Sequence, residues 1–195
     1  MSEGLSTRHG WPSLRTRLPI PAAVLDLGCG CGVPVASSLA DAGHQVTGVD
    51  ISDVQIERAR RLVPAGAFIR ADAAQVDFPP ASFDAVVCLY ALIHLPLDDQ
   101  PGPLRRVVTW LRPGGWLLAT TGYRAWTGTE DNWLGGPAAM WWSHADAGTY
   151  RSWLSEAGLD ITPRSSSRRA QAGTRCSGRS GRAEPAATAT SAPGG

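Results

Sequence analysis

The sequence predicts an α/β fold, with a doubly wound, mostly parallel sheet that carries helices on both faces. Short apolar segments alternate with helix-compatible segments between residues 23 and 121, the order found in parallel sheets joined by crossover helices. The strand candidates are hydrophobic along most of their length, as strands buried on both faces are. Glycines or polar residues follow four of these strands. Because the carboxyl ends of parallel strands share one edge of a sheet, we expect a ligand site there.

The expected elements follow in regular order. Strands are expected at Ala23–Asp26, Gln45–Asp50, Ala67–Arg70, Ser82–Tyr90 and Trp116–Thr121, and a sixth starts at Leu159–Ile161. Helices are expected at Val33–Ala42, Val54–Leu62, Asp98–Leu111 and Asp146–Ala157. Gly43, Pro64 and Gly158 follow three of these helices, as glycine caps a helix end and proline cannot continue a helix. Asp84, at the start of the fourth strand, is expected to serve the structure of the sheet.

Composition divides the chain into three parts. Residues 1–18 are expected to form a partly disordered N-terminal segment with a short helix, and residues 19–162 a ligand-binding domain. Within that domain, the tryptophan- and glycine-rich residues 123–144 are expected to form an irregular cap over the strand ends. Residues 163–195 contain no Val, Ile, Leu, Met, Phe, Trp or Tyr, so they are expected to be a disordered tail, and the sheet to lack its terminal strands. A natural tail and a reading frame lost near residue 162 both explain this composition.

Charge and cysteine content narrow the class of function. All 18 basic residues are arginines, and residues 1–162 hold 12 of them against 16 Asp and Glu, a net charge of −4. This mildly acidic domain does not favour a nucleic-acid partner. The four cysteines lack zinc spacing, so no metal site is expected, and a reducing, cytoplasmic location is the default. No apolar run predicts a membrane span or a signal peptide. No feature predicts an oligomeric state.

The most specific local pattern is a glycine turn after the first strand. Asp26 is followed by Gly28, Gly30 and Gly32 at alternate positions, before a predicted helix. Such a turn brings backbone N–H groups close to a ligand, because glycine has no Cβ and tolerates positive φ. A dinucleotide-binding turn needs a glycine or alanine where this chain has Val33. A nicotinamide-dependent oxidoreductase is therefore the weaker alternative.

The Asp-x-Gly-x-Gly-x-Gly pattern of residues 26–32 resembles motif I of the class I S-adenosylmethionine-dependent methyltransferases. Four further segments match that family in the same order: 46–52, 71–73, 82–87 and 111–115. The resemblance runs from Val24 to about Gly122, and more loosely to Ile161. It implies a Rossmann-like methyltransferase fold, S-adenosylmethionine as cofactor, and methyl transfer to a small-molecule acceptor.

The resemblance also implies roles for individual residues in holding the cofactor. Gly28, Gly30 and Gly32 would approach its methionine part, and Asp26 would meet the amino group directly or through water. Asp50 would accept hydrogen bonds from both ribose hydroxyls, since a carboxylate offers two acceptor oxygens. Around the adenine and the sulfonium, the expected contacts are Ile51, Asp72, Ala73, Leu89 and Tyr90.

Methyl transfer from a sulfonium depends mainly on positioning, and a general base is needed only if the acceptor must lose a proton. His94, just after the fourth strand, is the first candidate for this base, and His144 is the second. Trp141 and Trp142 are candidates for an aromatic roof over an apolar or aromatic acceptor. Since the terminal strands are expected to be missing, a protein that binds the cofactor but is catalytically impaired remains the main alternative.

Overall fold

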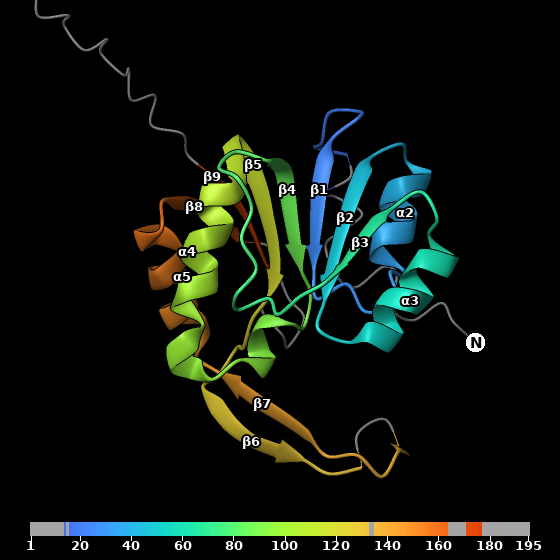
Figure 1. Ribbon diagram of the computed structural model, residues 1–195. Helices are drawn as coiled ribbons and strands as arrows, with labels where there is room; N and C mark the ends of the chain where they lie inside the picture. The colour runs from blue at the N-terminus through green and yellow to red at the C-terminus, as the bar shows by residue number, and fades with distance from the viewer. Residues whose placement is uncertain (1–13, 15, 133–134, 164–170, 177–195) are drawn as a thin grey trace, which may run out of the picture.

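A seven-stranded sheet forms the centre of the computed structural model, which describes residues 14, 16–132, 135–163 and 171–176 (Figure 1). The strand order is β3-β2-β1-β4-β5-β9-β8. Its strands are β1 (Ala23–Leu27), β2 (Gln45–Asp50), β3 (Ala67–Arg70), β4 (Phe83–Cys88), β5 (Leu111–Thr120), β8 (Leu159–Pro163) and β9 (Gln171–Cys176). Strands β1 to β5 pair in parallel, whereas β9 runs antiparallel to both β5 and β8.

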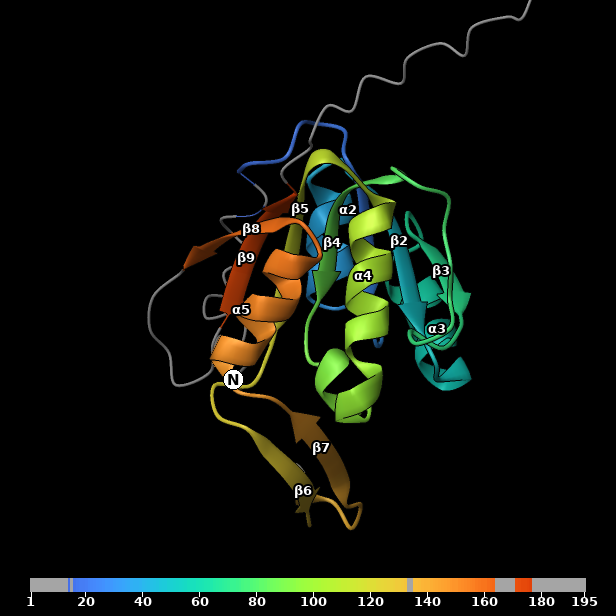
Figure 2. The same ribbon diagram turned by 90° about the vertical axis from the view of Figure 1, so that its left-hand side faces the viewer.

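Helices cover both faces of the sheet, which confirms the predicted fold class (Figures 1 and 2). The helices are α2 (Val35–Asp41), α3 (Asp53–Leu62), α4 (Pro101–Trp110) and α5 (Ala147–Glu156), with two short 3-10 helices, η1 (Leu92–His94) and η2 (Leu97–Asp99). Apolar side chains of α2 and α3 pack with one face of the sheet, and those of α4 and α5 with the other. Val24 and Leu25 belong to these two different cores, because successive strand residues point to opposite faces.

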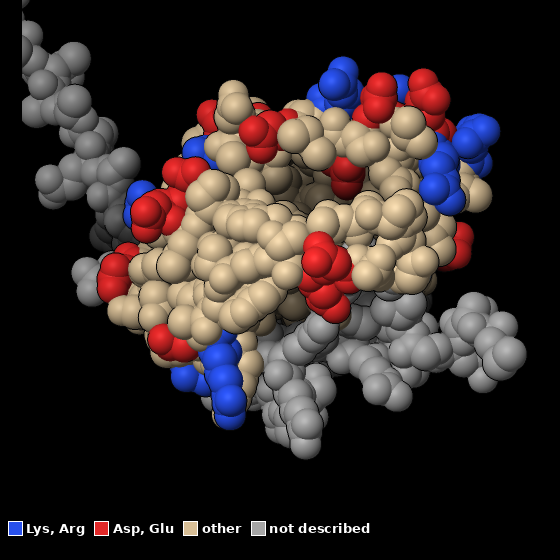
Figure 3. All heavy atoms as spheres, turned by 90° about the horizontal axis from the view of Figure 1, so that it is seen from below, with Lys and Arg blue, Asp and Glu red and all other residues tan. Residues whose placement is uncertain are grey.

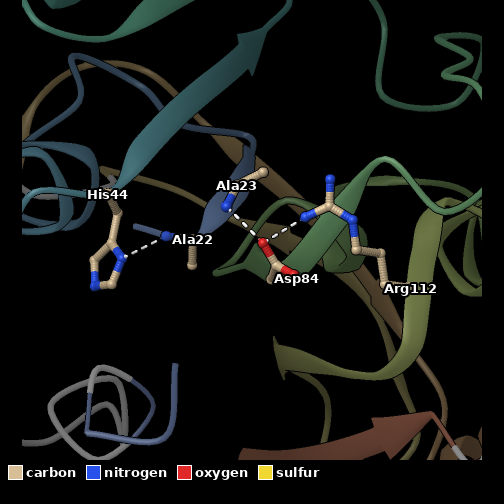
Figure 4. Close-up of polar contacts among 5 residues, drawn as sticks. All are labelled: Ala22, Ala23, His44, Asp84 and Arg112. Carbon is tan, nitrogen blue, oxygen red and sulfur yellow. Dashed lines mark hydrogen bonds and ion pairs between the residues drawn. The ribbon is translucent and has the colours of Figure 1, made fainter. Parts of the chain in front are cut away.

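Polar contacts fasten the amino-terminal ends of three strands together (Figure 4). The carboxylate of Asp84 accepts hydrogen bonds from the backbone N–H of Ala23 at 2.7 Å and from the Arg112 guanidinium at 2.6 Å. Nearby, a ring nitrogen of His44 accepts from the backbone N–H of Ala22 at 3.2 Å. Asp84 therefore joins β1, β4 and β5, and its expected structural role is confirmed.

Residues 123–144 are not an irregular cap. They contain a two-stranded antiparallel hairpin of β6 (Trp126–Glu130) and β7 (Met140–His144), which projects from the carboxyl-terminal edge of the sheet (Figure 1). The strands contain threonines in β6 and tryptophans in both, which favour extended backbone. The glycines that suggested irregular structure lie within or between these strands.

The expectation of missing terminal strands is also wrong. Strand β9 lies between β5 and β8, so β5 is not an open edge of the sheet. The composition of residues 163–195 predicted disorder because it offers little apolar surface to bury. Backbone hydrogen bonds to two neighbours nevertheless place Gln171–Cys176 in the sheet, and such bonds do not depend on apolar side chains. The rest of the predicted tail, and most of the helix expected at Trp11–Leu18, lie outside the described residues.

Candidate active site at the carboxyl edge of the sheet

The glycine turn lies beside the carboxyl end of β2. The backbone N–H groups of Gly28 and Cys29 donate to the Val49 carbonyl at 2.8 and 2.9 Å. Gly28 has φ +79°, and a Cβ there would lie 2.3 Å from the Cβ of Ala91. Gly30 has φ +53°, and a Cβ there would meet nothing within 4 Å. The absence of a Cβ on Gly28 thus allows the segment that follows β4 to pack against the turn. Gly30 faces open space, where a ligand can approach.

The third glycine, Gly32, faces the protein interior. A Cβ at this position would lie 3.2 Å from Val63 and 3.3 Å from Phe68. These side chains belong to the core on the α2–α3 face of the sheet. Gly32 therefore serves packing between the turn and that core.

Asp50 holds the turn in place from the end of β2. One carboxylate oxygen accepts from the Gly30 N–H at 2.8 Å, and the other accepts from the Ser52 N–H at 2.9 Å. Each carboxylate oxygen can accept a further hydrogen bond. Asp50 can therefore fix the glycine turn and still bind two ligand hydroxyls.

Asp26 is a buried carboxyl group in β1, 3% exposed. Its Oδ2 atom has no hydrogen-bond partner among the described residues. The pKa of Asp26 is raised to about 7, mainly by burial and also by the negative charge of Asp50, while a hydrogen bond from the Ala36 backbone opposes this rise. A cationic ligand group near Asp26 would favour its ionised form.

The segment after β4 packs against the glycine turn. Leu89 packs against the core on the α2–α3 face. Tyr90 has φ +64°, a left-handed conformation that is strained for a residue with a Cβ and that clusters at functional sites. This backbone turn leads directly into Ala91, whose Cβ occupies the space beside Gly28.

The remaining residues predicted for the adenine region lie after β2 and β3. Ile51 is 67% exposed, an unusual position for a large apolar side chain. Asp72 accepts hydrogen bonds from the Ala74 N–H at 2.8 Å and the Gln75 side chain at 3.1 Å. Ala73 packs against the core on the α4–α5 face. Asp72 thus stabilises its own turn and keeps spare acceptor capacity.

Acidic and uncharged groups dominate the surface at this edge. Figure 3 views the molecule from below, onto the edge, and shows a hollow with an acidic group at its wall. The basic groups in this view lie towards the rim. The hollow is therefore suited to a cationic or neutral ligand rather than an anionic one.

The hairpin brings the aromatic residues to His94. The Nδ1 atom of His94 lies 3.0 Å from the Trp141 carbonyl oxygen, and its ring centroid lies 4.5 Å from that of Trp142. Trp142 is buried, whereas Trp141 is 38% exposed, because consecutive strand residues point to opposite faces. Only one of these two side chains can therefore line the same wall as His94.

His144, the second candidate base, lies at the end of β7. Its ring packs 6.1 Å from that of Trp126, and its Nδ1 atom is buried without a hydrogen-bond partner among the described residues. A Cβ on Gly122 would lie 2.1 Å from this nitrogen. His144 thus sits against the backbone that leaves β5, farther along the hairpin strand than the contacts of His94.

Two polar groups near the site were not predicted from sequence. Gln100 is fully buried and hydrogen-bonded to three elements. The buried Oγ1 of Thr120 has no partner among the described residues. A glutamine between two loop acids and a proline gives no sequence signal of burial, so pattern analysis could not have identified Gln100.

A family model described as "Methyltransferase domain" matches residues 24–115, which contain the glycine turn, Asp50, Asp72 and His94. Solved S-adenosylmethionine-dependent methyltransferases share the fold. Residues 24–115 form a domain of the class I S-adenosylmethionine-dependent methyltransferase family. The predicted family is thereby confirmed.

Curated relatives of this methyltransferase domain are named for different methyl acceptors. A sterol 24-C-methyltransferase of Aspergillus fumigatus is 37% identical over 107 residues, which cover 49% of this chain and 28% of the relative. The 27-O-demethylrifamycin SV methyltransferase of Amycolatopsis mediterranei is 40% identical over 108 residues, or 51% and 39% of the two chains. The match thus spans between about a quarter and two fifths of the relatives' length.

Solved structures match over most of the described fold. A methyltransferase from Mesorhizobium loti has a TM-score of 0.70 at 24% identity, and covers 88% of this chain and 100% of its own. The 1,6-didemethyltoxoflavin-N1-methyltransferase of Burkholderia thailandensis has a TM-score of 0.70 at 20% identity, over 88% and 78% of the two chains. The [4+2]-cyclase SpnF matches with a TM-score of 0.62 at 27% identity, over 79% and 57%.

S-adenosylmethionine is the cofactor of this methyltransferase family, and the carboxyl edge of the sheet fits it. The fit rests on a glycine turn open at Gly30, spare acceptor capacity on Asp50, and the buried, unpartnered Oδ2 of Asp26. The cofactor carries hydroxyls and two cationic groups, which these acceptors suit.

Among the described residues, no three potential metal ligands lie together. The helices described there are also too short or too polar to span a bilayer.

Proposed function

We propose that the protein transfers a methyl group from S-adenosylmethionine to a small apolar or aromatic acceptor, with no nucleic-acid or membrane partner. The observation that carries this proposal is the meeting of three features at one edge of the sheet. The glycine turn is held by Asp50, the segment after β4 abuts that turn, and the hairpin brings Trp142 to His94. A cofactor site and an aromatic acceptor site would thus be adjacent, as methyl transfer requires.

The cofactor supplies a methyl group on a sulfonium, which is a good leaving group. Asp50 would accept from the ribose hydroxyls through the lone pairs left free by its two backbone contacts. Asp26 would face the cofactor's amino group. Gly28, Gly30 and Gly32 would shape the turn around its methionine part. The adenine would lie between Ile51 and the turn at Asp72 and Ala73, with Leu89 and Tyr90 near the sulfonium.

His94 is the better candidate for a general base, should the acceptor need to lose a proton. A backbone carbonyl only accepts hydrogen bonds, so the contact with Trp141 places a proton on Nδ1 of the neutral imidazole. This arrangement leaves the lone pair of Nε2 able to accept a proton from the acceptor. His144 lacks a comparable orienting partner on Nδ1 among the described residues, and is the second candidate.

The acceptor's character follows from the charges around the hairpin. Residues 125–144 contain two acidic residues, Glu130 and Asp131, and no Arg or Lys. An anionic acceptor would find no countercharge on this segment, whereas an uncharged aromatic molecule could stack on Trp142 or Trp141. Cys29, Cys31 and Cys88 are free thiols, which is compatible with the proposed reducing compartment, such as the cytoplasm.

The alternative of an impaired enzyme rested on missing terminal strands, and β8 and β9 occupy those positions. The proposal is tested by incubating the full chain with S-adenosylmethionine and a panel of neutral phenols, quinols and hydroxylated polyketides. S-adenosylhomocysteine and a product one methyl group heavier are expected together, and His94→Gln should lower their rate by roughly 100-fold. Cofactor binding without either product would support the impaired alternative, and a product of unchanged mass would support cyclase-type chemistry.

A further inference from the structure

Gln100, just before α4, is a buried side chain that makes three hydrogen bonds near the hairpin. Its exposed fraction is 0%. The amide nitrogen donates to the Leu95 carbonyl at 2.9 Å and to the Ser143 carbonyl at 2.7 Å. The amide oxygen accepts a hydrogen bond from the Tyr150 hydroxyl. A buried amide with both ends satisfied holds its neighbours in one arrangement, because any movement would leave a buried polar group unpaired.

These three bonds join two parts of the chain that are far apart in sequence, the segment that follows η1 and the segment from β7 to α5. Leu95 directly follows η1, Ser143 belongs to β7, and Tyr150 belongs to α5. Since the Tyr150 hydroxyl engages the amide oxygen, the nitrogen is directed towards the two carbonyls. Gln100 therefore clamps β7 against the end of η1.

The same two elements carry the contacts of His94. His94 is the last residue of η1, one position before Leu95. The carbonyl that faces its Nδ1 atom belongs to Trp141, two positions before Ser143 on β7, and Trp142 packs against its ring. The two hydrogen bonds from the Gln100 amide nitrogen and the two contacts of His94 thus connect the same short stretches of η1 and β7.

We propose that Gln100 is the positioning residue for His94. By clamping β7 against η1, it keeps the Trp141 carbonyl on Nδ1, so that the neutral imidazole carries its proton there and Nε2 remains the proton acceptor. In an imidazole without such a partner, the two tautomers exchange and the Nε2–H form is favoured. This inference rests on the proposed role of His94 as base, but the tautomer can be measured without an acceptor.

Nitrogen NMR of the ¹⁵N-histidine-labelled full chain at pH 8 tests the proposal, with a His94→Gln sample to assign the resonances. In the wild type, we expect well-separated His94 resonances, with Nδ1 protonated and Nε2 unprotonated. Gln100→Met is similar in volume but removes all three bonds. It should collapse this separation or reverse it towards the Nε2–H tautomer.

Thr127→Val is the matched control. Thr127 shares a hydroxyl contact of 3.0 Å with the Ser143 side chain, so its loss removes a hydrogen bond of the same hairpin without touching the clamp. The His94 resonances should not change in this variant. Affinity for S-adenosylhomocysteine should stay within about twofold of wild type in both variants, because neither residue contacts the proposed cofactor residues.

If Gln100→Met does not fold, Tyr150→Phe replaces it, since that change removes only the bond that orients the amide. Partial loss of the Nδ1–H form is then expected. A folded Gln100→Met or Tyr150→Phe protein in which His94 keeps its proton on Nδ1 would overturn the positioning role. Full methyl transfer by His94→Gln would instead contradict the proposed base, whatever the tautomer result.

Discussion

Aspartates lie at both ends of the parallel strands, but their hydrogen-bond partners differ between the two ends. At the amino-terminal edge, Asp84 pairs with Arg112 and with the backbone of Ala23. At the carboxyl edge, Asp26 has an oxygen without a partner among the described residues, and Asp50 meets only backbone N–H groups there. At the amino-terminal edge, the carboxylate of Asp84 is paired within the protein. At the carboxyl edge, the carboxylates keep acceptor capacity for a cationic, hydroxyl-rich ligand.

The largest expected effect is a pH dependence of the free energy of unfolding, which arises from Asp26 at the carboxyl edge. The pKa of Asp26 is raised from 3.8 to about 7 by folding, so the folded protein holds a proton that the unfolded chain has lost between these values. The associated stability is present at low pH and is lost as pH rises through 7. This rise corresponds to about 4 kcal/mol. Asp26→Asn should therefore gain stability relative to wild type progressively from pH 4 to pH 8.

Urea unfolding at several pH values measures this gain. Asp98→Asn, at an exposed position of η2, controls for the loss of one negative charge. A difference between Asp26→Asn and wild type that is independent of pH would refute the burial argument for Asp26.

The second effect concerns Asp50 and the cofactor. Asp50→Ala removes the acceptor for the Gly30 and Ser52 N–H groups and the proposed acceptor for two ribose hydroxyls. Charge-assisted hydrogen bonds contribute about 1.5–3 kcal/mol each, so affinity for S-adenosylhomocysteine should fall by at least roughly 100-fold. Calorimetric titration measures the affinity. Asp53→Ala, three residues further and exposed, should bind as wild type does, and equal affinities in the two variants would dismiss the ribose role.

The third effect compares two glycines with nearly equal backbone angles. Gly28 has φ +79° and Gly114 has φ +78°, but only a Cβ on Gly28 would collide with a neighbour, Ala91. Both alanine variants should lose about 1–2 kcal/mol of stability from the left-handed conformation. Only Gly28→Ala should also bind S-adenosylhomocysteine more weakly, and Ala91→Gly in the same chain should restore part of the affinity. No restoration would mean that the close approach does not shape the cofactor turn.

The smallest effect lies at the amino-terminal edge. Arg112 is partly exposed, so its ion pair with Asp84 is screened by solvent. Arg112→Ala should lower the free energy of unfolding by about 0.5–1 kcal/mol and leave cofactor affinity unchanged. Weaker binding of S-adenosylhomocysteine by this variant would contradict the claim that only the carboxyl edge takes part in cofactor binding.

The sequence predicted the parallel part of the fold closely, because each strand there is locally apolar and bounded by a turn. The predicted ranges Gln45–Asp50 and Ala67–Arg70 are those of β2 and β3. The predicted fifth strand started at Trp116, whereas β5 begins at Leu111. Its extension includes a proline and two glycines, which sequence patterns assign to turns.

The antiparallel strands escaped prediction for two different reasons. In β9, backbone pairing with two neighbours replaces the apolar burial that sequence patterns detect. In β6 and β7, the sequence has no regular alternation of apolar and polar residues, and the glycines indicated irregular structure. For the same reason, Trp141 and Trp142 were expected to act together, although their side chains leave β7 on opposite sides. Gln100 illustrates a further limit, because its partners are backbone carbonyls, which any sequence would provide.

Calorimetric titration of the full chain with S-adenosylhomocysteine tests the central claim most directly, namely that the carboxyl edge of this sheet binds the cofactor. We expect binding at one site per chain near neutral pH, with proton release if Asp26 becomes ionised in the complex. NAD should give no heat of binding under the same conditions. Binding of NAD, or no binding of S-adenosylhomocysteine by the folded protein, would contradict the account.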